Sequence, residues 1–294
     1  MSIPFNSRCL LCHLGKAMKT AEAHGDEATA MSFARELMEE YRKAPADVGS
    51  PWFAPATADL LHKYYGLDID RFRQEKLDSN AFAMARLEQI RARVEAAEDP
   101  VYAGLQYAVL GNYIDFSALH GEVSLEKLDE MLPLGEKIEL DRECYRKLRE
   151  DLAAGSSLLY ITDNAGEIVF DRICAEQIHK AFPHVAITFC VRGGPANNDA
   201  TREDAAAVGI SFPVIDNGNR IPGTQIEQLS DQARQAFESA HVILAKGQGN
   251  VETLFGCGRN IYYAFLVKCI LFMEKFQKPK LTPMLLRERD VTCK

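Results

Sequence analysis

Five short apolar segments alternate with helical segments in the second half of the chain, and this alternation limits the possible folds more than any other feature. The first of them, residues 157–161, is too short for a buried helix. Strands that alternate with helices form βαβ units, and such units build a parallel sheet. We predict strands at residues 157–161, 185–191, 212–215, 241–245 and 261–267, and helices at residues 168–181, 201–208, 230–240 and from residue 251 onward.

The first half of the chain has a helical pattern. Between residues 26 and 42, apolar side chains recur at the i, i+3 and i+4 spacing of an amphipathic helix. Further helices are expected at residues 70–97, 101–110, 124–132 and 141–153, with Ser124 and Asp141 as the N-caps of the last two. The predicted fold is α/β: an all-helical N-terminal domain at residues 1–153, then a doubly wound, mainly parallel α/β/α (Rossmann-like) domain at residues 154–294.

Composition and charge exclude several classes of protein. Hydrophobic residues make up 47% and charged residues 26% of the 294 residues, which excludes a disordered chain. The formal net charge of −8 argues against broad nucleic-acid binding. No apolar stretch approaches the roughly 20 residues that a membrane span needs, and residues 1–19 lack the pattern of a secretory signal. We therefore expect a cytoplasmic protein that binds neither nucleic acid nor a membrane and keeps its eight cysteines reduced.

Polar, glycine-containing loops follow the first four predicted strands. Open parallel sheets bind ligands outside the carboxyl ends of their strands, so these loops would converge on one cleft if the strands are neighbours. Glycine in such a loop lets the backbone approach a ligand closely. The loops read Thr-Asp-Asn-Ala-Gly-Glu at 162–167, Arg-Gly-Gly-Pro-Ala-Asn-Asn-Asp at 192–199, Asp-Asn-Gly at 216–218 and Lys-Gly-Gln-Gly-Asn at 246–250.

The side chains in these loops suit metal-assisted phosphoryl transfer. Asp163 and Asp199 offer carboxylate oxygens and Asn164 offers a carbonyl oxygen, which are ligands that Mg²⁺ and Mn²⁺ prefer. Lys246 offers a positive charge for a phosphoryl group, and the amides after it lie where a helix begins. Each residue also has a structural interpretation, since acids and amides cap helices and a lysine is commonly a solvated side chain.

In order and spacing, these motifs resemble those of the damage-control phosphatase family, which was long described as a domain of unknown function. An earlier element, Gly-Asn-Tyr-Ile-Asp at 111–115, is similar to the Gly-Asn-x-Ile-Asp element of the prokaryotic branch. The resemblance implies a metal-dependent phosphatase in which a helical domain packs on an α/β/α domain. It spans nearly the whole chain and is carried by residues 163–167, 194–195, 198–201 and 246–250.

The resemblance also implies roles for individual residues. The metal ligands of the family match Asp163, Asn164 and Asp199, and the lysine that contacts phosphate matches Lys246. The expected cofactor is Mg²⁺, Mn²⁺, Co²⁺ or Ni²⁺, and the attacking group is either a metal-activated water or the Asp163 carboxylate. The expected substrate is a small phosphorylated metabolite, such as a sugar phosphate. The expected substrate-binding residues are Asn112, Asp115, Glu167, Asn198, Lys246, Gly247 and Asn250.

Three cysteines suggest a second site. Prokaryotic members of the family often carry an N-terminal Cys-x-x-Cys and a distant Lys-Cys, which match Cys9, Cys12 and Cys269 here. Together they could form a second metal site or a redox site, although one Cys-x-x-Cys supplies only two of the four ligands that structural zinc usually takes. Reduced thiols packed against the core are the alternative. The segment after Cys269 departs from the family pattern, in which a short glycine-containing turn is expected.

Two other functions are compatible with this sequence. One is an S-adenosylmethionine-dependent carboxyl methyltransferase, although no Gly-x-Gly-x-x-Gly follows the first predicted strand. The other is a non-enzymatic thiol or metal sensor built on the three cysteines. The sequence leaves the physiological substrate, the metal used in the cell and the oligomeric state open.

Overall fold

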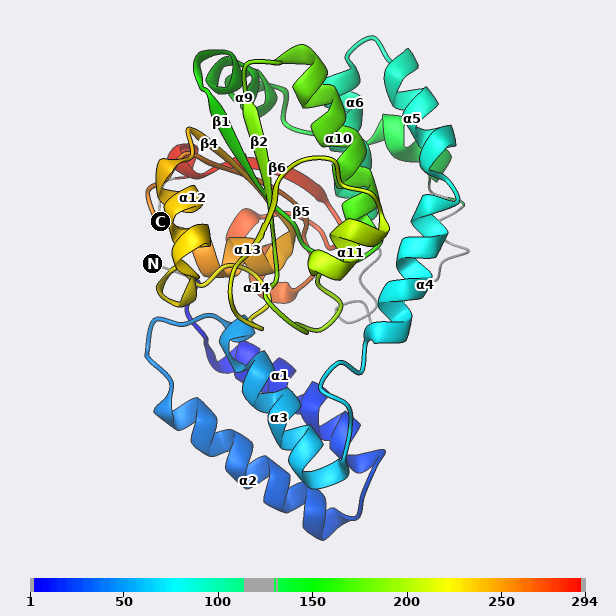
Figure 1. The fold of residues 1–294 in the computed structure, drawn as a ribbon. Helices are drawn as coiled ribbons and strands as arrows, with labels where there is room; N and C mark the ends of the chain where they lie inside the picture. The colour runs from blue at the N-terminus through cyan, green and yellow to red at the C-terminus, as the bar shows by residue number, and fades with distance from the viewer. Residues whose placement is uncertain (1–2, 114–129, 131, 292–294) are drawn as a thin grey trace.

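The computed structural model describes residues 3–113, 130 and 132–291, and a six-stranded sheet with the strand order β3-β2-β1-β4-β5-β6 forms its centre (Figure 1). The first five strands pair in parallel, and β6 pairs antiparallel with β5. The predicted α/β fold with a mainly parallel sheet is therefore confirmed. The strands are β1 (Ser157–Ile161), β2 (Ala186–Val191), β3 (Val214–Asp216), β4 (Val242–Lys246), β5 (Ile261–Leu266) and β6 (Pro283–Arg287).

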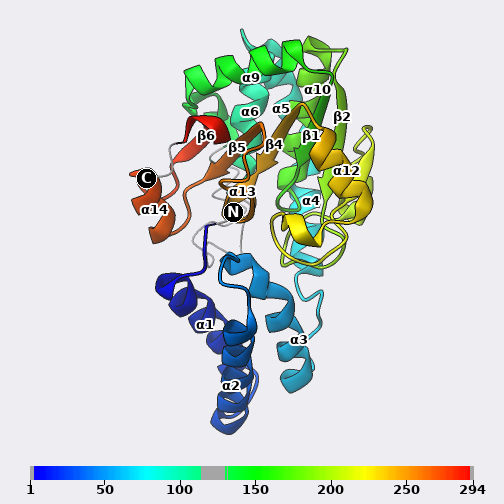
Figure 2. The same cartoon turned by 90° about the vertical axis from the view of Figure 1, so that its left-hand side faces the viewer.

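Helices cover both faces of the sheet, because successive side chains of each strand point to opposite faces. Leu158 and Tyr160 of β1 belong to one apolar cluster, and Leu159 and Ile161 to another. The first cluster includes side chains of α6 (Pro100–Gly111), α9 (Arg142–Ala154) and α10 (Glu167–Ala181). The second includes side chains of α12 (Asp231–Ser239), α13 (Gly247–Leu254) and α14 (Ile270–Phe276) (Figures 1 and 2). The result is a three-layer α/β/α arrangement.

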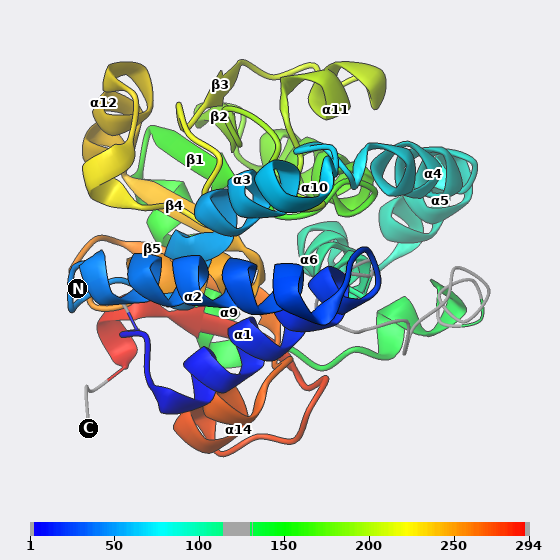
Figure 3. The same ribbon diagram turned by 90° about the horizontal axis from the view of Figure 1, so that it is seen from below.

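Three N-terminal helices extend away from the sheet as a separate lobe (Figures 1 and 2), and in the view from below they lie in front of it (Figure 3). They are α1 (Ser7–Glu22), α2 (Glu27–Lys43) and α3 (Ala54–Tyr65). Their apolar faces form a small core of their own, made of Ala17, Ala21, Ala30, Phe33, Leu37, Leu60 and Leu61. Within the described residues, no helix is both long enough and apolar enough to cross a membrane.

The remaining N-terminal helices lie beside the sheet. Apolar residues of α6 and α9 share one core with α10 and with β1, β2 and β4, so elements from both sides of residue 153 pack together. The domain division at residue 153 stays a prediction. The other helices are α4 (Arg73–Met84), α5 (Leu87–Ala96) and α11 (Arg202–Ala207), and the short 3₁₀ helices are η1 (Ser50–Phe53), η2 (Leu132–Lys137), η3 (Ile226–Gln228) and η4 (Glu288–Asp290).

Several element boundaries differ from the sequence-based expectation. The expected long helix at 70–97 is interrupted between α4 and α5, where Arg86 Nη1 donates to the Phe82 carbonyl oxygen at 3.0 Å. The helix expected from residue 251 begins earlier, at Gly247. The sequence pattern predicts neither α14 nor β6, both of which are short. The expected helix at 124–132, with its Ser124 cap, falls almost wholly outside the described residues.

Candidate active site

The strand order reverses between β1 and β4. From β1 the sheet grows through β2 to β3 on one side, and through β4 to β5 on the other. Such a reversal of strand order is where open α/β sheets bind ligands, outside the carboxyl ends of the strands. Asp163 follows β1 at this point, and Gly247 follows β4.

Backbone hydrogen bonds join the loop after β1 to the loop after β2. The Ala200 N–H donates to the Asp163 carbonyl oxygen at 2.7 Å, and the Ala165 N–H donates to the Asn198 carbonyl oxygen at 2.9 Å. Asn164 and Asp199 form an antiparallel bridge between the two loops. The structure thus brings together the three residues expected to bind metal, as the predicted convergence of the loops requires. Their roles as ligands stay predictions.

Two side-chain amides link the Asp163 and Glu167 carboxylates. Asn164 Nδ2 donates to Asp163 Oδ2 at 2.8 Å and to Glu167 Oε2 at 2.9 Å. Asn112 Nδ2 donates to the same two oxygens at 2.9 and 2.8 Å, and the Leu266 N–H donates to Asn112 Oδ1 at 3.3 Å. Asn112 therefore reaches the site from α6, although it is wholly buried. Asp115 lies outside the described residues.

Lys246 lies inside a buried charged network. Its Nζ donates to the Ala108 carbonyl oxygen at 2.7 Å, to Glu167 Oε1 at 2.7 Å and to Asp171 Oδ1 at 2.9 Å. Burial lowers the pKa of Lys246, but Asp171 and Glu167 raise it more, so its pKa lies above the usual range. The ammonium has three donors and contacts three acceptors. A contact with phosphate, as expected from the sequence, would require one of these bonds to be released.

The Asp171 carboxylate completes this network. It accepts a hydrogen bond from the Tyr160 hydroxyl at 2.8 Å, in addition to the bond from Lys246. Burial raises the pKa of Asp171 to about 7, against the opposing effect of Lys246. Neither Asp171 nor Tyr160 stands in a loop motif, so the sequence analysis did not select them. The available signal was an acid four residues after Glu167, on the same face of the predicted helix.

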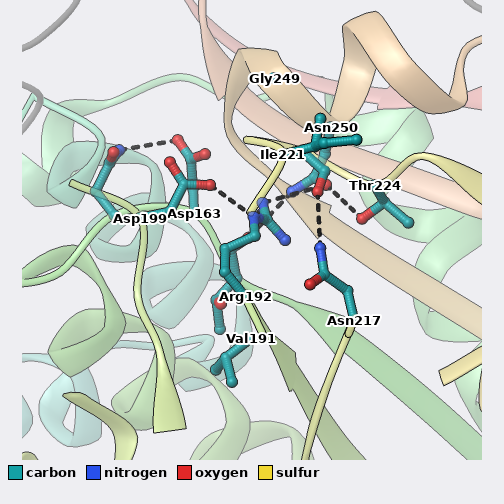
Figure 4. Close-up of polar contacts among 12 residues, drawn as sticks. Asp163, Val191, Arg192, Asp199, Asn217, Ile221, Thr224, Gly249 and Asn250 are labelled. Atoms are coloured by element: carbon teal, nitrogen blue, oxygen red, sulfur yellow. Dashed lines mark hydrogen bonds and ion pairs between the residues drawn. The ribbon is translucent and has the colours of Figure 1, made fainter. Parts of the chain in front are cut away.

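Arg192 is the second buried cation beside the site, and Figure 4 shows it among Asp163, Asp199 and Asn250. Its Nε donates to Asp199 Oδ2 at 2.6 Å, and its Nη2 donates to the Thr162 carbonyl oxygen at 3.0 Å. Arg192 belongs to a strand-end loop motif, but the motif predicted no role for it. An arginine directly after a buried apolar strand was the signal that could have identified it, because arginine is rarely buried unless it is paired.

Asn250 connects α13 to the ends of two strands. Its Nδ2 donates to the Thr162 carbonyl oxygen at 3.1 Å and to the Lys246 carbonyl oxygen at 2.6 Å. Its Oδ1 accepts from the Thr224 hydroxyl at 2.8 Å (Figure 4). Because Asn250 is wholly buried, these bonds fix the first turn of α13 against β1 and β4. Its expected role in substrate binding stays a prediction, as do those of Glu167, Asn198 and Gly247.

Gly247 is the residue that permits the Asp163 carboxylate to lie against the start of α13. Its φ is +76°, and a Cβ at this position would lie 1.9 Å from Asp163 Oδ2. Any side chain would therefore displace the carboxylate. Glycine is required here both for the backbone conformation and for the space.

A second buried charged pair fixes the loops from the side of α4. Lys76 Nζ lies 2.7 Å from Asp204 Oδ2, and Asn80 Nδ2 donates to Asp204 Oδ1 at 2.8 Å. The Gly166 N–H donates to Asn80 Oδ1 at 2.7 Å. Asp204 forms a capping box with Thr201 at the start of α11. Helix α4 thus holds the N-termini of both α10 and α11, the helices that follow the two acidic loops.

The three cysteines of the possible second site lie near the junction of the lobe and the sheet. Cys9 and Cys12 belong to α1, and Cys269 caps α14, where its Sγ accepts from Gln248 at 3.4 Å. Burial, and then the Glu252 carboxylate, raise the pKa of both Cys9 and Cys269, so Glu252 lies close to both thiols. In the part of the chain that the structure describes, no three Cys, His, Asp or Glu side chains are arranged to hold a metal.

The molecule is thus an α/β protein with a mainly parallel sheet and acidic loops at the reversal of its strand order, the place where such sheets commonly bind ligands. The chain belongs to the family described as the damage-control phosphatase ARMT1-like domain, whose model matches residues 5–281. The family resemblance inferred from the motifs is therefore confirmed.

Individual relatives agree with this assignment. The chain is 32% identical over 282 residues to the damage-control phosphatase PH1575 of Pyrococcus horikoshii, covering 92% of this chain and 94% of the relative. It is 28% identical over 270 residues to a damage-control phosphatase of Archaeoglobus fulgidus, covering 89% of this chain and 91% of the relative. The crystal structure of the Pyrococcus protein, described as a DUF89 family protein, matches with a TM-score of 0.79 at 28% identity and covers 97% of this chain and 99% of that one. Together these similarities support a phosphatase, and hence a hydrolase, function.

Proposed function

We propose that this protein is a divalent-metal-dependent phosphatase that hydrolyses small phosphorylated metabolites, such as sugar phosphates or related damaged phospho-metabolites. The observation that carries the proposal is the convergence of Asp163, Asn164 and Asp199 at the reversal point of the sheet, through hydrogen bonds between their loops. Membership of a family named for phosphatase activity supports the same reaction class.

The residues present fit a divalent cation in two respects. Two carboxylates and an amide are a hard oxygen donor set, and Gly247 leaves the Asp163 carboxylate in a space that a Cβ would fill. Charge supports the same conclusion. The buried network joins four carboxylates, Asp163, Asp199, Glu167 and Asp171, to the two cations Lys246 and Arg192. Because burial raises the pKa of Asp171 to about 7, only the other three carboxylates are counted as fully ionised, and they outnumber the two cations by 3 − 2 = 1. The described side chains thus carry an excess of negative charge, which favours a bound cation.

A divalent cation held by Asp163, Asn164 and Asp199 would polarise the phosphoryl oxygens and offset their charge. The chain itself contributes the first turn of α13, whose backbone N–H groups at Gly247 and Gln248 have no acceptor within the helix and can bind phosphoryl oxygens. Asn112 and Asn164 hold the Asp163 carboxylate rigidly from one side. The attacking group is either water or the Asp163 carboxylate, and a phosphoaspartyl intermediate trapped in a single turnover would identify the carboxylate.

The first test is metal dependence of p-nitrophenyl phosphate hydrolysis. We expect EDTA to abolish activity and Mg²⁺, Mn²⁺, Co²⁺ or Ni²⁺ to restore it. Asp163→Asn should lose activity by about 10³-fold or more, since it removes a charged group that contacts the cation, while it retains the circular dichroism spectrum. The matched control is Asp231→Asn, which makes the same change at an exposed position of α12 and should keep full activity.

The result that would contradict the proposal is hydrolysis that persists in EDTA and in Asp163→Asn. Isothermal titration with S-adenosylmethionine is the companion measurement, since tight binding would favour the methyltransferase alternative. A screen of sugar phosphates and nucleotides with each metal then identifies the substrate class. This screen is needed because the shape of the pocket, and not the metal-binding residues, determines which substrate is accepted.

A further inference from the structure

Arg192 is buried in a way that stability alone does not explain. Its side chain is 0% exposed, yet its Nη1 is buried without a hydrogen-bond partner among the described residues. A buried ionic group with an unsatisfied donor costs folding free energy, and a well-packed apolar residue at such a position is often equally stable or more stable. A group retained at that cost calls for a functional explanation.

The bonds that Arg192 does make all converge on the loops of the site. Its backbone N–H donates to the Ala200 carbonyl oxygen at 2.9 Å, and the Ala200 N–H in turn donates to the Asp163 carbonyl oxygen. Its Nε holds Asp199 Oδ2, and its Nη2 reaches the Thr162 carbonyl oxygen and, at 3.5 Å, Asn250 Oδ1. One planar guanidinium therefore joins the ends of β1 and β2 to the start of α13.

We infer that Arg192 is a positioning residue, which orients the Asp199 carboxylate toward the cation and fixes it relative to Asp163 and the first turn of α13. This inference rests on the proposed function, because it takes Asp199 as a cation ligand. By binding one oxygen of Asp199 inside the protein, Arg192 determines the direction of the other. Groups that orient a metal ligand through such a contact typically change metal affinity by about 10–100-fold when they are removed.

The fork geometry explains why arginine rather than lysine stands here. Nε and Nη2 donate in different directions to a side chain and to a backbone carbonyl oxygen. A lysine ammonium presents a single point of attachment and cannot reproduce this rigid pair of contacts. Arg192→Lys therefore keeps the charge but loses the orientation.

The test is a direct measurement of Mn²⁺ affinity by titration calorimetry, for the wild type and for Arg192→Met, Arg192→Lys and Asp199→Asn. We expect Arg192→Met to weaken Mn²⁺ binding by about 10–100-fold, with a smaller loss in Arg192→Lys. At saturating Mn²⁺, kcat for p-nitrophenyl phosphate should fall while KM stays close to the wild-type value. The double variant Arg192→Met with Asp199→Asn should bind Mn²⁺ no more weakly than Asp199→Asn alone, because Arg192 acts through Asp199.

Arg172→Met is the matched control. Arg172 lies on α10, where its Nε donates to Glu176 at 2.9 Å and its Nη1 to the Val208 carbonyl oxygen at 2.8 Å. This variant should lose stability but keep the wild-type Mn²⁺ affinity. If Arg192→Met does not fold, Arg192→Lys decides the question by the same measurement.

The outcomes separate the two proposals. If Asp199→Asn binds Mn²⁺ as the wild type does, the proposed metal site is wrong. If Asp199→Asn loses affinity while Arg192→Lys and any folded Arg192→Met retain wild-type affinity and kcat, the positioning role is overturned and the metal site stands.

Discussion

Gly247 connects a backbone conformation to the chemistry of the site. Because its Cα lies against the Asp163 carboxylate, Gly247→Ala should displace that carboxylate. We expect Mn²⁺ affinity to fall by about 10-fold or more, as for other changes that misplace a metal ligand, with a parallel loss of phosphatase activity. Calorimetric titration with Mn²⁺ measures the first effect, and p-nitrophenyl phosphate hydrolysis measures the second.

Gly258→Ala separates this effect from backbone strain. Gly258 has a φ of +78°, but a Cβ there would meet no atom within 4 Å. Both substitutions place alanine in the left-handed region, at a cost of roughly 1–2 kcal/mol. Equal losses of Mn²⁺ affinity in the two variants would show that strain, and not the displaced carboxylate, is responsible.

The variant Lys246→Met tests whether this lysine stabilises the fold. Its removal in Lys246→Met leaves the buried carboxylates of Glu167 and Asp171 without their shared cation. We expect the free energy of unfolding in urea to fall by about 3–5 kcal/mol. Lys63→Met, which breaks the exposed pair with Glu36, should cost less than about 1 kcal/mol. A stable Lys246→Met variant with only a raised KM would instead indicate a direct contact with phosphate.

At the scale of residues, the sequence predicted where the metal-binding candidates lie better than it predicted the contacts of the charged residues around them. The strand-end rule placed Asp163, Asn164 and Asp199 together because loops follow strands in a fixed way in parallel sheets. The contacts of Lys246 depend on which face of α10 packs on β1. The contacts of Arg192 depend on how its loop folds back so that the Arg192 N–H can donate to the Ala200 carbonyl oxygen. Both arise from tertiary packing, which no local pattern encodes.

Among the helices, α4 has an influence on the site that its sequence does not reveal. Asn80→Ala would leave the Gly166 N–H without its acceptor and Asp204 Oδ1 without the donor Asn80 Nδ2, while Asp204 Oδ2 keeps its contact with Lys76. We expect the free energy of unfolding to fall by about 1–3 kcal/mol, and phosphatase activity to fall as well, because the two acidic loops lose a common support. Urea denaturation and a steady-state assay measure these effects.

Gln74→Ala serves as the control on the same helix. Its side chain donates only to Asp78 at 2.9 Å on the exposed surface. Stability should change by less than about 0.5 kcal/mol. An Asn80→Ala variant as stable and active as Gln74→Ala would show that α4 does not support the loops.

Elements with a strong pattern were predicted, and so was the short edge strand β3, whereas the short helix α14 and the edge strand β6 were not. Strands β1, β2, β4 and β5 are mostly buried apolar segments that stand out from their polar loops. β6 is an edge strand that begins with Pro283, a residue compatible with edge strands and otherwise a signal against a strand. The start of α13 was placed too late because its first turn is rich in glycine, which usually indicates a loop.

For the molecule as a whole, Glu252 links stability to pH at the junction of the lobe and the sheet. Its backbone carbonyl oxygen accepts from the Ile3 N–H at 2.8 Å, and burial raises the pKa of its side chain to about 7 from the ordinary 4.5. Between these values the folded protein keeps a proton that the unfolded chain loses. The free energy of unfolding contributed by Glu252 therefore falls as pH rises from 4.5 to 7.

Glu252→Gln should remove this dependence. Relative to the wild type, the variant should gain about 1–2 kcal/mol in the free energy of unfolding between pH 4.5 and pH 7.5, as measured by urea denaturation at each pH. Glu95→Gln provides a control of opposite sign, because the hydrogen bond from Lys180 lowers the pKa of Glu95. A gap between Glu252→Gln and the wild type that stays constant with pH would contradict the prediction.

The arrangement of the lobe is the part of the fold that the sequence could predict least. Helical periodicity identifies α2 and the segments of α4, α5 and α6 alike, but it does not say which of them leave the sheet, and it gave no separate prediction for α1 or α3. Their separation depends on the small core of the lobe and on contacts such as the pair of Arg220 with Asp59. These contacts join residues far apart in the chain.

The strand order has a consequence for how the protein is made. β1 and β4 are neighbours in the sheet, but β2, β3 and three helices separate them along the chain. The residues up to and including Gly247 must therefore be synthesised before the proposed cation site can form. Nascent chains that stop after β3 would carry both acids of the proposed site but no α13 to confine them, so we expect metal binding at this site only after α13 has been synthesised.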